Sequence, residues 1–378
     1  MAQRLAWVGI VGVFLWVGGC DKKSGPGPSG RDDAGTITKK SSPPAPKKTA
    51  PPTKRPAGQL SEREVTFQST GIKLEGTFTV PLAAKGGKKV PAFFIVHGSG
   101  NQNRDGEFTQ GGMTFRTYLE ISRALVKAGF AVLRYDKRTY TMKKKGLLTL
   151  ETVHQLTAQQ PIDDGRAAFD FLTRQKEVDT KRIFFLGHSI AGAYVKDIIA
   201  GKSVAGVVLV APIILPYREH LIHQADVQLK AMSKVLKNSP IMLPSQRKRL
   251  EQTVQMLTKM KTAYPKVFKM IDDGKFPAKG LVIGVPLAFH KGLEKLTAGL
   301  PTTFASLPVP VLYINGENDM ICPVDAVKKF EPILRKKTDL TLFYVKDLGH
   351  HQYTMSTNSF VDAVPAKIAS WAQQIPKK

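Results

Sequence analysis

Cysteine and acidic residues are scarce in this sequence of 378 residues. The only cysteines are Cys20 and Cys322, so any modification of Cys20 excludes an intramolecular disulfide. Asp and Glu number 30 against 56 Lys and Arg, which gives a formal net charge of +26, yet no five basic residues are consecutive. This charge makes nucleic acid and anionic membranes the first partners to consider, but it does not indicate a fold.

Several well-known site motifs are also missing. The sequence has no Walker loop, no dinucleotide-binding fingerprint and no HExxH motif, so we expect no cofactor. His220 and His223 lie three residues apart without a cysteine or a further acidic ligand, and we expect them on a solvated helix face rather than at a metal. Basic residues do not alternate with aromatic ones and no recognition motif occurs, so we expect no nucleic-acid partner.

The N-terminus has the features of an export signal. Arg4 precedes an apolar run, Leu5–Val17, that is too short to span a bilayer comfortably, and small residues precede Cys20. The segment Val17–Cys20 resembles the lipobox of bacterial lipoproteins, in which the cysteine is acylated and becomes the new N-terminus. This resemblance implies a signal peptide at residues 1–19, lipidation of Cys20 and a place in the bacterial cell envelope. An uncleaved signal anchor is the alternative, and the choice between inner and outer membrane stays open.

Residues 20–60 form a segment with almost nothing to bury. Positions 21–60 contain eight prolines and five glycines, together with nine basic and three acidic residues. This composition predicts an extended, solvated tether. Its net charge of +6 would be attracted to anionic headgroups, so we expect a membrane partner through Cys20 and this basic tether.

From about Ser61 the pattern is that of a globular α/β domain. Val65–Ser69 and Ile72–Val80 alternate apolar and polar residues, which indicates an antiparallel hairpin. Apolar strands then alternate with helical segments, so we predict a mostly parallel central sheet flanked by helices. The predicted strands are 92–96, 130–134, 182–186, 206–210, 309–314 and 340–345, and the predicted helices are 115–128, 161–175, 191–200, 325–334 and 360–374.

The interval between Val210 and Val309 is far longer than a crossover connection needs. Apolar residues recur at helical spacing twice within it, from Leu221 to Leu236 and from Leu250 to Tyr264. We therefore expect a helical cap at residues 216–304, inserted into a core formed by residues 61–215 and 305–378. Between positions 217 and 304 lie 15 basic and six acidic residues, a net charge of +9.

Ser189 lies between a buried strand and a helical segment, in the sequence Gly187–Ala191 (GHSIA). A tight turn at this place lifts a serine hydroxyl clear of the sheet, and small residues two positions before and after the serine prevent clashes. Gly187 meets the first requirement. Ala191 stands where glycine is usual, but its side chain is small enough to fit. The sequence therefore predicts a nucleophilic serine.

A glycine-rich loop, His97–Gly100 (HGSG), follows an earlier apolar strand. Its backbone N–H groups could stabilise a negatively charged oxygen during acyl transfer. An ordinary glycine turn is the alternative interpretation.

A serine nucleophile needs a base and an acid that orients the base. In this architecture both follow the serine, each in the loop after a strand. Asp319 and His350 satisfy that order, with Glu317 or Asp325 as alternative acids and His351 as the alternative base. Cys322 lies beside the acid loop and is expected to be an inert, partly buried thiol.

Taken together, these motifs resemble the α/β-hydrolase superfamily, in particular its serine esterase, acyl-peptidase-like and dienelactone-hydrolase-like members. The resemblance includes the HGSG loop with Arg104-Asp105-Gly106, the segment Arg134–Arg138 (RYDKR) and the segment Asp163–Ala168 (DDGRAA). Thr139-Tyr140 and His351-Gln352 depart from the family pattern.

The resemblance implies an α/β-hydrolase fold with an inserted helical cap. It also implies that Ser189 attacks an acyl carbonyl, that His350 accepts its proton and that Asp319 orients the imidazole. Backbone N–H groups of Ile190 and Ser99 would form the oxyanion hole. We therefore expect a serine hydrolase acting on a small-molecule acyl ester. A peptidase or amidase of the same fold and a catalytically silent binding protein are the alternatives, and the oligomeric state is left open.

Overall fold

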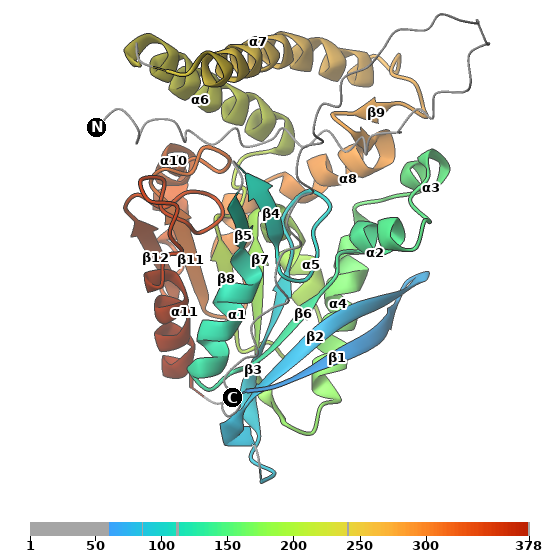
Figure 1. Cartoon of the computed structure of the whole chain (residues 1–378). Coiled ribbons are helices and arrows are strands. Elements are labelled where there is room, and N and C mark those ends of the chain that lie inside the picture. Colours follow the sequence, from blue (N-terminus) through green and yellow to red (C-terminus); the bar gives the residue numbers. More distant parts are fainter. Residues whose placement is uncertain (1–59, 85, 111–112, 240–241, 377–378) are drawn as a thin grey trace, which may run out of the picture.

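The computed structural model describes residues 60–84, 86–110, 113–239 and 242–376. Cys20, the predicted signal peptide and the predicted tether lie outside these residues. An eight-stranded sheet forms the centre of the molecule, with helices on both faces (Figure 1). In spatial order its strands are β1 (Leu60–Ser69), β2 (Ile72–Pro81), β6 (Ala131–Tyr135), β3 (Val90–Val96), β7 (Val178–His188), β8 (Gly206–Val210), β11 (Val311–Gly316) and β12 (Leu340–Val345).

The sheet is mostly parallel, as the sequence predicts. The β1–β2 hairpin is antiparallel, β2 also runs antiparallel to β6, and the remaining neighbours are parallel. Side chains on the central strands alternate between two apolar clusters because successive residues of a strand point to opposite faces. In β3, for example, Phe94 belongs to one cluster, whereas Phe93 and Ile95 belong to the other.

Helices bury both faces of the sheet. α1 (Thr117–Lys127) and α11 (Ala363–Gln374) contribute to the cluster on one face. α4 (Gln159–Thr173), α5 (Val195–Ile199) and α10 (Val324–Leu334) contribute to the cluster on the other face. This two-sided cover explains why the central strands are continuous apolar runs.

The strand order reverses between β3 and β7. From β3 the chain crosses to β6 on one side, and it then returns to β7 on the other side of β3. The loops that leave the carboxyl ends of β3 and β7 therefore diverge, and a crevice forms between them. The glycine-rich loop follows β3 and Ser189 follows β7, so the topology brings these two predicted features together.

The predicted helices begin within a few residues of their observed starts, and three of them differ more clearly in start or type. Phe115 belongs to strand β5 (Met113–Arg116), which pairs with β4 (Glu107–Gln110), and α1 begins only at Thr117. The chain after β7 forms a 3₁₀ helix, η3 (Ser189–Tyr194), before α5. The last helix, α11, begins three residues later than predicted. The short elements η2 (Leu82–Ala84), α2 (Arg138–Lys144) and α3 (Leu150–His154) were not predicted.

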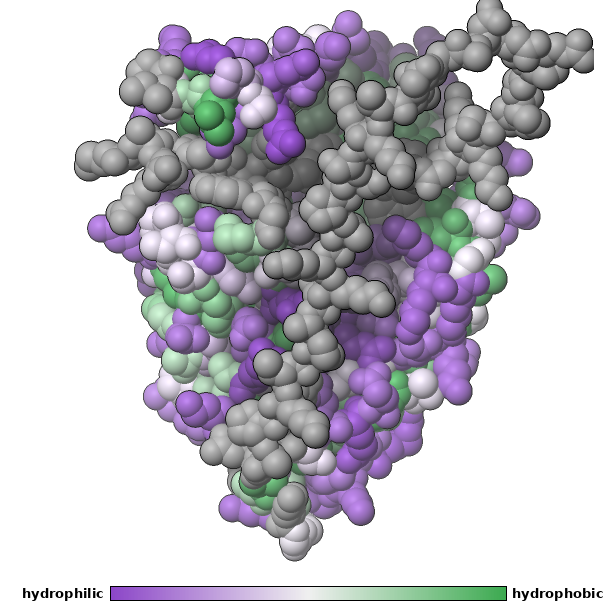
Figure 2. Space-filling model, viewed as in Figure 1, coloured by the Kyte–Doolittle hydropathy of each residue, from purple (hydrophilic) through white to green (hydrophobic). Residues whose placement is uncertain are grey.

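Residues 216–304 contain two long helices that lie across the carboxyl edge of the sheet (Figure 1). α6 and α7 pack on each other through small apolar clusters separate from the sheet core. Their outer surface is predominantly hydrophilic in the view of Figure 2. The elements of this segment are α6 (Tyr217–Asn238), α7 (Pro244–Asp272), β9 (Leu281–Val282), β10 (Val285–Pro286), α8 (Leu287–Thr297) and α9 (Leu300–Ala305). No helix in the part of the chain that the structure describes is both long enough and apolar enough to cross a bilayer.

Candidate active site

Ser189 occupies a strained position at the carboxyl end of β7. Its φ is +57°, in the left-handed region that non-glycine residues rarely adopt. A Cβ atom on Gly187 would lie 2.5 Å from the Phe185 ring and 3.2 Å from the Cβ of Ala191, so glycine is needed before the turn. Ala191 is accommodated after it, fully buried. The sharp turn predicted from the sequence is therefore present.

His350 and Asp319 come together from the loops after β12 and β11. The Nδ1 of His350 lies 2.8 Å from the Oδ2 of Asp319, and both residues are buried. The second carboxylate oxygen of Asp319 accepts hydrogen bonds from the backbone N–H groups of Ile321 and Cys322, each at 2.8 Å. These bonds fix the carboxylate, so Asp319 can hold the imidazole of His350 in one orientation.

The alternative acids and the alternative base lie in surroundings that differ from those of Asp319 and His350. Glu317 is exposed, and Asp325 pairs with His223 at 3.1 Å near the surface. His351 packs against the ring of Phe108 in the β4–β5 hairpin, with 4.0 Å between ring centroids. Among these residues the structure joins only His350 with a carboxylate at the cavity described below.

Two ion pairs fasten the glycine-rich loop to β6. Arg104 contacts the carboxylate of Asp136 through Nε at 3.0 Å and Nη2 at 2.9 Å, and Asp105 pairs with Arg134. The loop also approaches the nucleophile turn closely, because a Cβ on Gly98 would lie 3.1 Å from the Cβ of Ser189. The RDG and RYDKR motifs thus hold the loop against Ser189.

A buried chain of hydrogen bonds connects this loop to His350. The backbone N–H of Gly98 donates to the hydroxyl of Tyr118 at 3.0 Å, and that hydroxyl lies 3.0 Å from Nδ1 of His188 and 3.0 Å from the side-chain amide of Gln102. The Nε2 of His188 lies 3.0 Å from the carbonyl oxygen of His350. Because a carbonyl oxygen can only accept, Nε2 carries the hydrogen and Nδ1 is an acceptor. The single hydrogen of the Tyr118 hydroxyl therefore faces two acceptors, Nδ1 of His188 and Oε1 of Gln102.

Burial sets the charge of the groups around Ser189. It lowers the pKa of His188 to about 3, with the nearby His350 acting in the same direction, so His188 is neutral near pH 7. Burial also raises the pKa of Cys322 well above its ordinary value, and Asp319 adds to this, although a hydrogen bond with Ser189 opposes it. Cys322, which is fully buried rather than partly buried, therefore stays a thiol.

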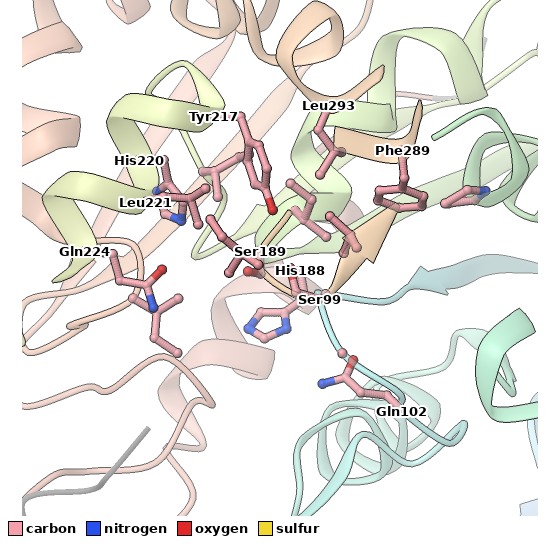
Figure 3. Close-up of a pocket in the computed structure, with 18 of the residues that line it drawn as sticks. Ser99, Gln102, His188, Ser189, Tyr217, His220, Leu221, Gln224, Phe289 and Leu293 are labelled. Atoms are coloured by element: carbon pink, nitrogen blue, oxygen red, sulfur yellow. The ribbon is translucent and has the colours of Figure 1, made fainter. Parts of the chain in front are cut away.

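Ser189 and His350 line one cavity of about 190 Å³ beneath α6 and α7. Ser99 and Ile190, the predicted oxyanion-hole residues, line it as well, and the backbone N–H of Gly98 next to them is already bonded to Tyr118. Figure 3 shows Ser189 between side chains of α6 and side chains of α8. The cavity therefore brings the candidate nucleophile, the candidate base and backbone donors to one place beneath the two long helices.

A family model described as serine aminopeptidase, S33, matches residues 111–354, which is more than half of the chain. The chain belongs to this α/β-hydrolase family. The hydrolase is 27% identical to the esterase EstD of Thermotoga maritima over 262 residues, which are 69% of this chain and 52% of that protein. The chain thus spans about half the length of this curated relative.

The hydrolase also matches the solved structure of an acylaminoacyl peptidase from Pyrococcus horikoshii. The TM-score is 0.54 at 14% identity, over 85% of this chain and 42% of that one. At this identity the similarity shows the fold alone. It agrees with the α/β-hydrolase fold predicted from the sequence.

His220 of the hydrolase is not on a solvated helix face as predicted. Its side chain is buried and lines the cavity, and burial lowers its pKa to about 3. His223, three residues later, pairs with Asp325 instead. Within the described residues, no group of three or more His, Cys, Asp or Glu side chains could hold a metal ion.

Sequence reasoning missed two residues that organise the site. Tyr118 was assigned to a generic helix, and His188 was noted only as part of the motif around Ser189. Their hydrogen bonds join segments 16 to 162 residues apart, so no local pattern could reveal them.

Proposed function

We propose that this hydrolase cleaves carboxylic esters through an acyl-enzyme intermediate. Ser189 Oγ attacks the ester carbonyl while His350 Nε2 takes the hydroxyl proton, and Asp319 stabilises the imidazolium. Backbone N–H groups of Ile190 and Ser99 stabilise the oxyanion. The alcohol leaves with the proton from His350, and water then hydrolyses the acyl-enzyme by the same steps in reverse. The observation that carries this proposal is the buried His350–Asp319 pair at the cavity that also holds the strained Ser189.

Cleavage of amides or peptides is the second candidate. The family description, a serine aminopeptidase, supports it, whereas the esterase from Thermotoga maritima supports ester cleavage. The same triad serves both reactions, but an amine leaving group depends more strongly on protonation by His350. A comparison of kcat/KM on an ester and on the amide of the same acid separates the two.

A fluorophosphonate probe tests whether the protein is a serine hydrolase at all. We expect the native protein to be labelled and the Ser189→Ala variant to remain unlabelled. Ser370→Ala, at an exposed position of α11, is the matched control and should be labelled like the native protein. Labelling that persists without Ser189, or a native protein that does not react, would show that the fold serves as a binding module or uses another nucleophile.

We further propose that Cys20 carries a lipid and that the basic tether places the enzyme at an anionic membrane. The support is the lipobox-like segment and the net charge of +6 in positions 21–60. Membrane fractionation of the full chain and of Cys20→Ala tests this, with Cys322→Ala as the control for loss of a thiol. Equal membrane association of the native protein and Cys20→Ala would contradict the proposal.

A further inference from the structure

One face of α6 presents a row of uncharged polar side chains to the cavity. His220, Gln224 and Gln228 are spaced four residues apart, so they lie one above another on the same side of the helix. All three line the cavity that contains Ser189. Figure 3 shows His220 and Gln224 projecting from α6 on one side of Ser189. The row extends the proposed catalytic site away from the sheet.

These side chains have no hydrogen-bond partner within the part of the chain that the structure describes. Gln228 is the clearest example, because only 1% of its surface is exposed and its amide nitrogen is both buried and unbonded. Buried polar groups in proteins are nearly always hydrogen-bonded. An unbonded amide at a cavity wall is therefore a group whose partner comes from outside the described residues, and a ligand in the cavity is such a partner.

The surroundings of this row are apolar and uncharged. The same cavity is lined by Leu257, Met260 and Tyr264 of α7, with Phe289 and Leu293 of α8. The charged residues that line the cavity belong to its opposite end, where Arg138 pairs with Asp164 and Lys137 donates to the carbonyl of Gly98. A ligand group beside Gln228 therefore meets a hydrogen-bonding amide but no ion.

The row begins near the proposed base, and its length along α6 follows from helix geometry. His220 is close enough to His350 for the two rings to interact electrostatically. Gln228 follows His220 by eight residues, which on an α-helix is about 12 Å. The far end of the row thus lies roughly two helical turns beyond His220.

We propose that α6 forms a distal subsite that hydrogen-bonds a neutral amide or hydroxyl group of the substrate, about 12 Å beyond His220 along the helix. The preferred substrate is then a bifunctional ester with an apolar middle, rather than a simple alkyl ester. This inference rests on the proposed ester hydrolysis. Gln228 is a specificity-determining residue in it, since a primary amide both donates and accepts and matches either group.

Two pairs of esters of equal chain length test the subsite. In the first pair the acyl group varies, with the 4-nitrophenyl esters of 8-acetamidooctanoic acid and undecanoic acid. In the second pair the alcohol varies, with the acetates of N-(8-hydroxyoctyl)acetamide and undecan-1-ol. For the native enzyme we expect the amide-containing ester of at least one pair to have the higher kcat/KM. Gln228→Leu should lower this preference about tenfold, the effect of one hydrogen bond.

Two controls separate the possible failures. Gln255→Leu makes the same substitution on an exposed part of α7 and should leave the preference unchanged. 4-Nitrophenyl acetate is too short to reach Gln228, so its hydrolysis reports the catalytic site alone. If the native enzyme hydrolyses this acetate but prefers neither amide ester, or if Gln228→Leu keeps the native preference, the subsite is wrong. If the native enzyme does not hydrolyse the acetate, the proposed ester hydrolysis itself is wrong. If Gln228→Leu does not fold, the preference of the native enzyme within the two pairs of esters still decides whether the subsite exists.

Discussion

His188 and Tyr118 lie behind the proposed catalytic groups and connect them. Neither side chain has to contact the substrate for this role. The neutral ring of His188 contacts the Tyr118 hydroxyl through Nδ1 and donates to the carbonyl of His350, while the Tyr118 hydroxyl accepts from Gly98. The loop beside Ser189 and the loop that carries His350 are therefore held by one buried network, in which each member fixes the next.

Tyr118→Phe tests this positioning role. The substitution removes one hydroxyl, which leaves the Gly98 N–H and His188 Nδ1 without partners in a buried place. We expect kcat on 4-nitrophenyl acetate to fall by about 10- to 100-fold with little change in KM, because binding survives and alignment is lost. Steady-state kinetics measure both constants.

Tyr140→Phe is the matched control, since no hydrogen bond of its hydroxyl to another described residue is found and it does not line the cavity. It should behave like the native enzyme. A Tyr118→Phe variant with native kcat, or with a raised KM alone, would show that the network does not position the catalytic groups.

The sequence predicted some site residues and missed others for a physical reason. Ser189, Asp319 and His350 follow strands, and their chain order is a property of the superfamily, so they could be selected from motifs. The burial of His220 and Gln228 depends on how α6 lies over the sheet, and the spacing of residues along a helix does not contain that information. For His220 this led to a wrong prediction.

At the scale of elements, a buried ion pair joins α2, α4 and the β1–β2 turn. Arg138 Nη2 lies 2.6 Å from Asp164 Oδ1, and the same oxygen accepts from the hydroxyl of Ser69 at 2.6 Å. Arg138 also donates to the carbonyl of Thr70. These residues belong to the motifs from which the family resemblance was inferred, but their contacts are structural.

Asp164→Ala should destabilise the fold strongly. It leaves the Arg138 guanidinium buried without a counter-charge, and breaking such a pair costs about 3–5 kcal/mol. Urea unfolding measures the free energy of unfolding. Asp163→Ala, one position earlier and less buried, is the control and should change it by less than about 0.5 kcal/mol. If Asp164→Ala changed the free energy of unfolding only slightly, water would have to solvate the Arg138 guanidinium in place of the carboxylate.

The element predictions failed mainly where the chain forms small, non-repeating structure. Phe115 extends the apolar periodicity of α1, yet it lies in β5 because Phe108 and Tyr353 stack against it. Long-range contacts of this kind override local propensity. The central strands were predicted within a few residues because both of their faces are buried, which makes them apolar throughout.

At the scale of the whole molecule, buried histidines make the fold sensitive to acid. Burial lowers the pKa of His290 and His351, and it lowers the pKa of His97, His188 and His220 to about 3 each. An unfolded histidine binds its proton near pH 6.5. Below that pH the unfolded state therefore holds more protons than the native state, and stability falls as the pH falls towards 3.

We expect the free energy of unfolding to decrease between pH 7.5 and pH 5 by on the order of 2 kcal/mol for each of His97, His188 and His220. Chemical unfolding at a series of pH values measures this. His220→Gln should reduce the slope without abolishing it, because one of the five histidines with a lowered pKa is removed. A stability that is constant over this range would contradict the neutral burial of the histidines.

The β1–β2 hairpin fixes where the N-terminal segment joins the molecule. Leu60 pairs with Pro81, and β2 runs antiparallel to the parallel strands. The start of β1 is therefore at the amino edge of those strands, whereas the cavity is lined by residues that follow their carboxyl ends, such as Ser99 and Ser189. A lipid on Cys20 would then be linked to the edge of the sheet opposite the cavity. Anchoring and substrate entry would take place at different edges of the sheet.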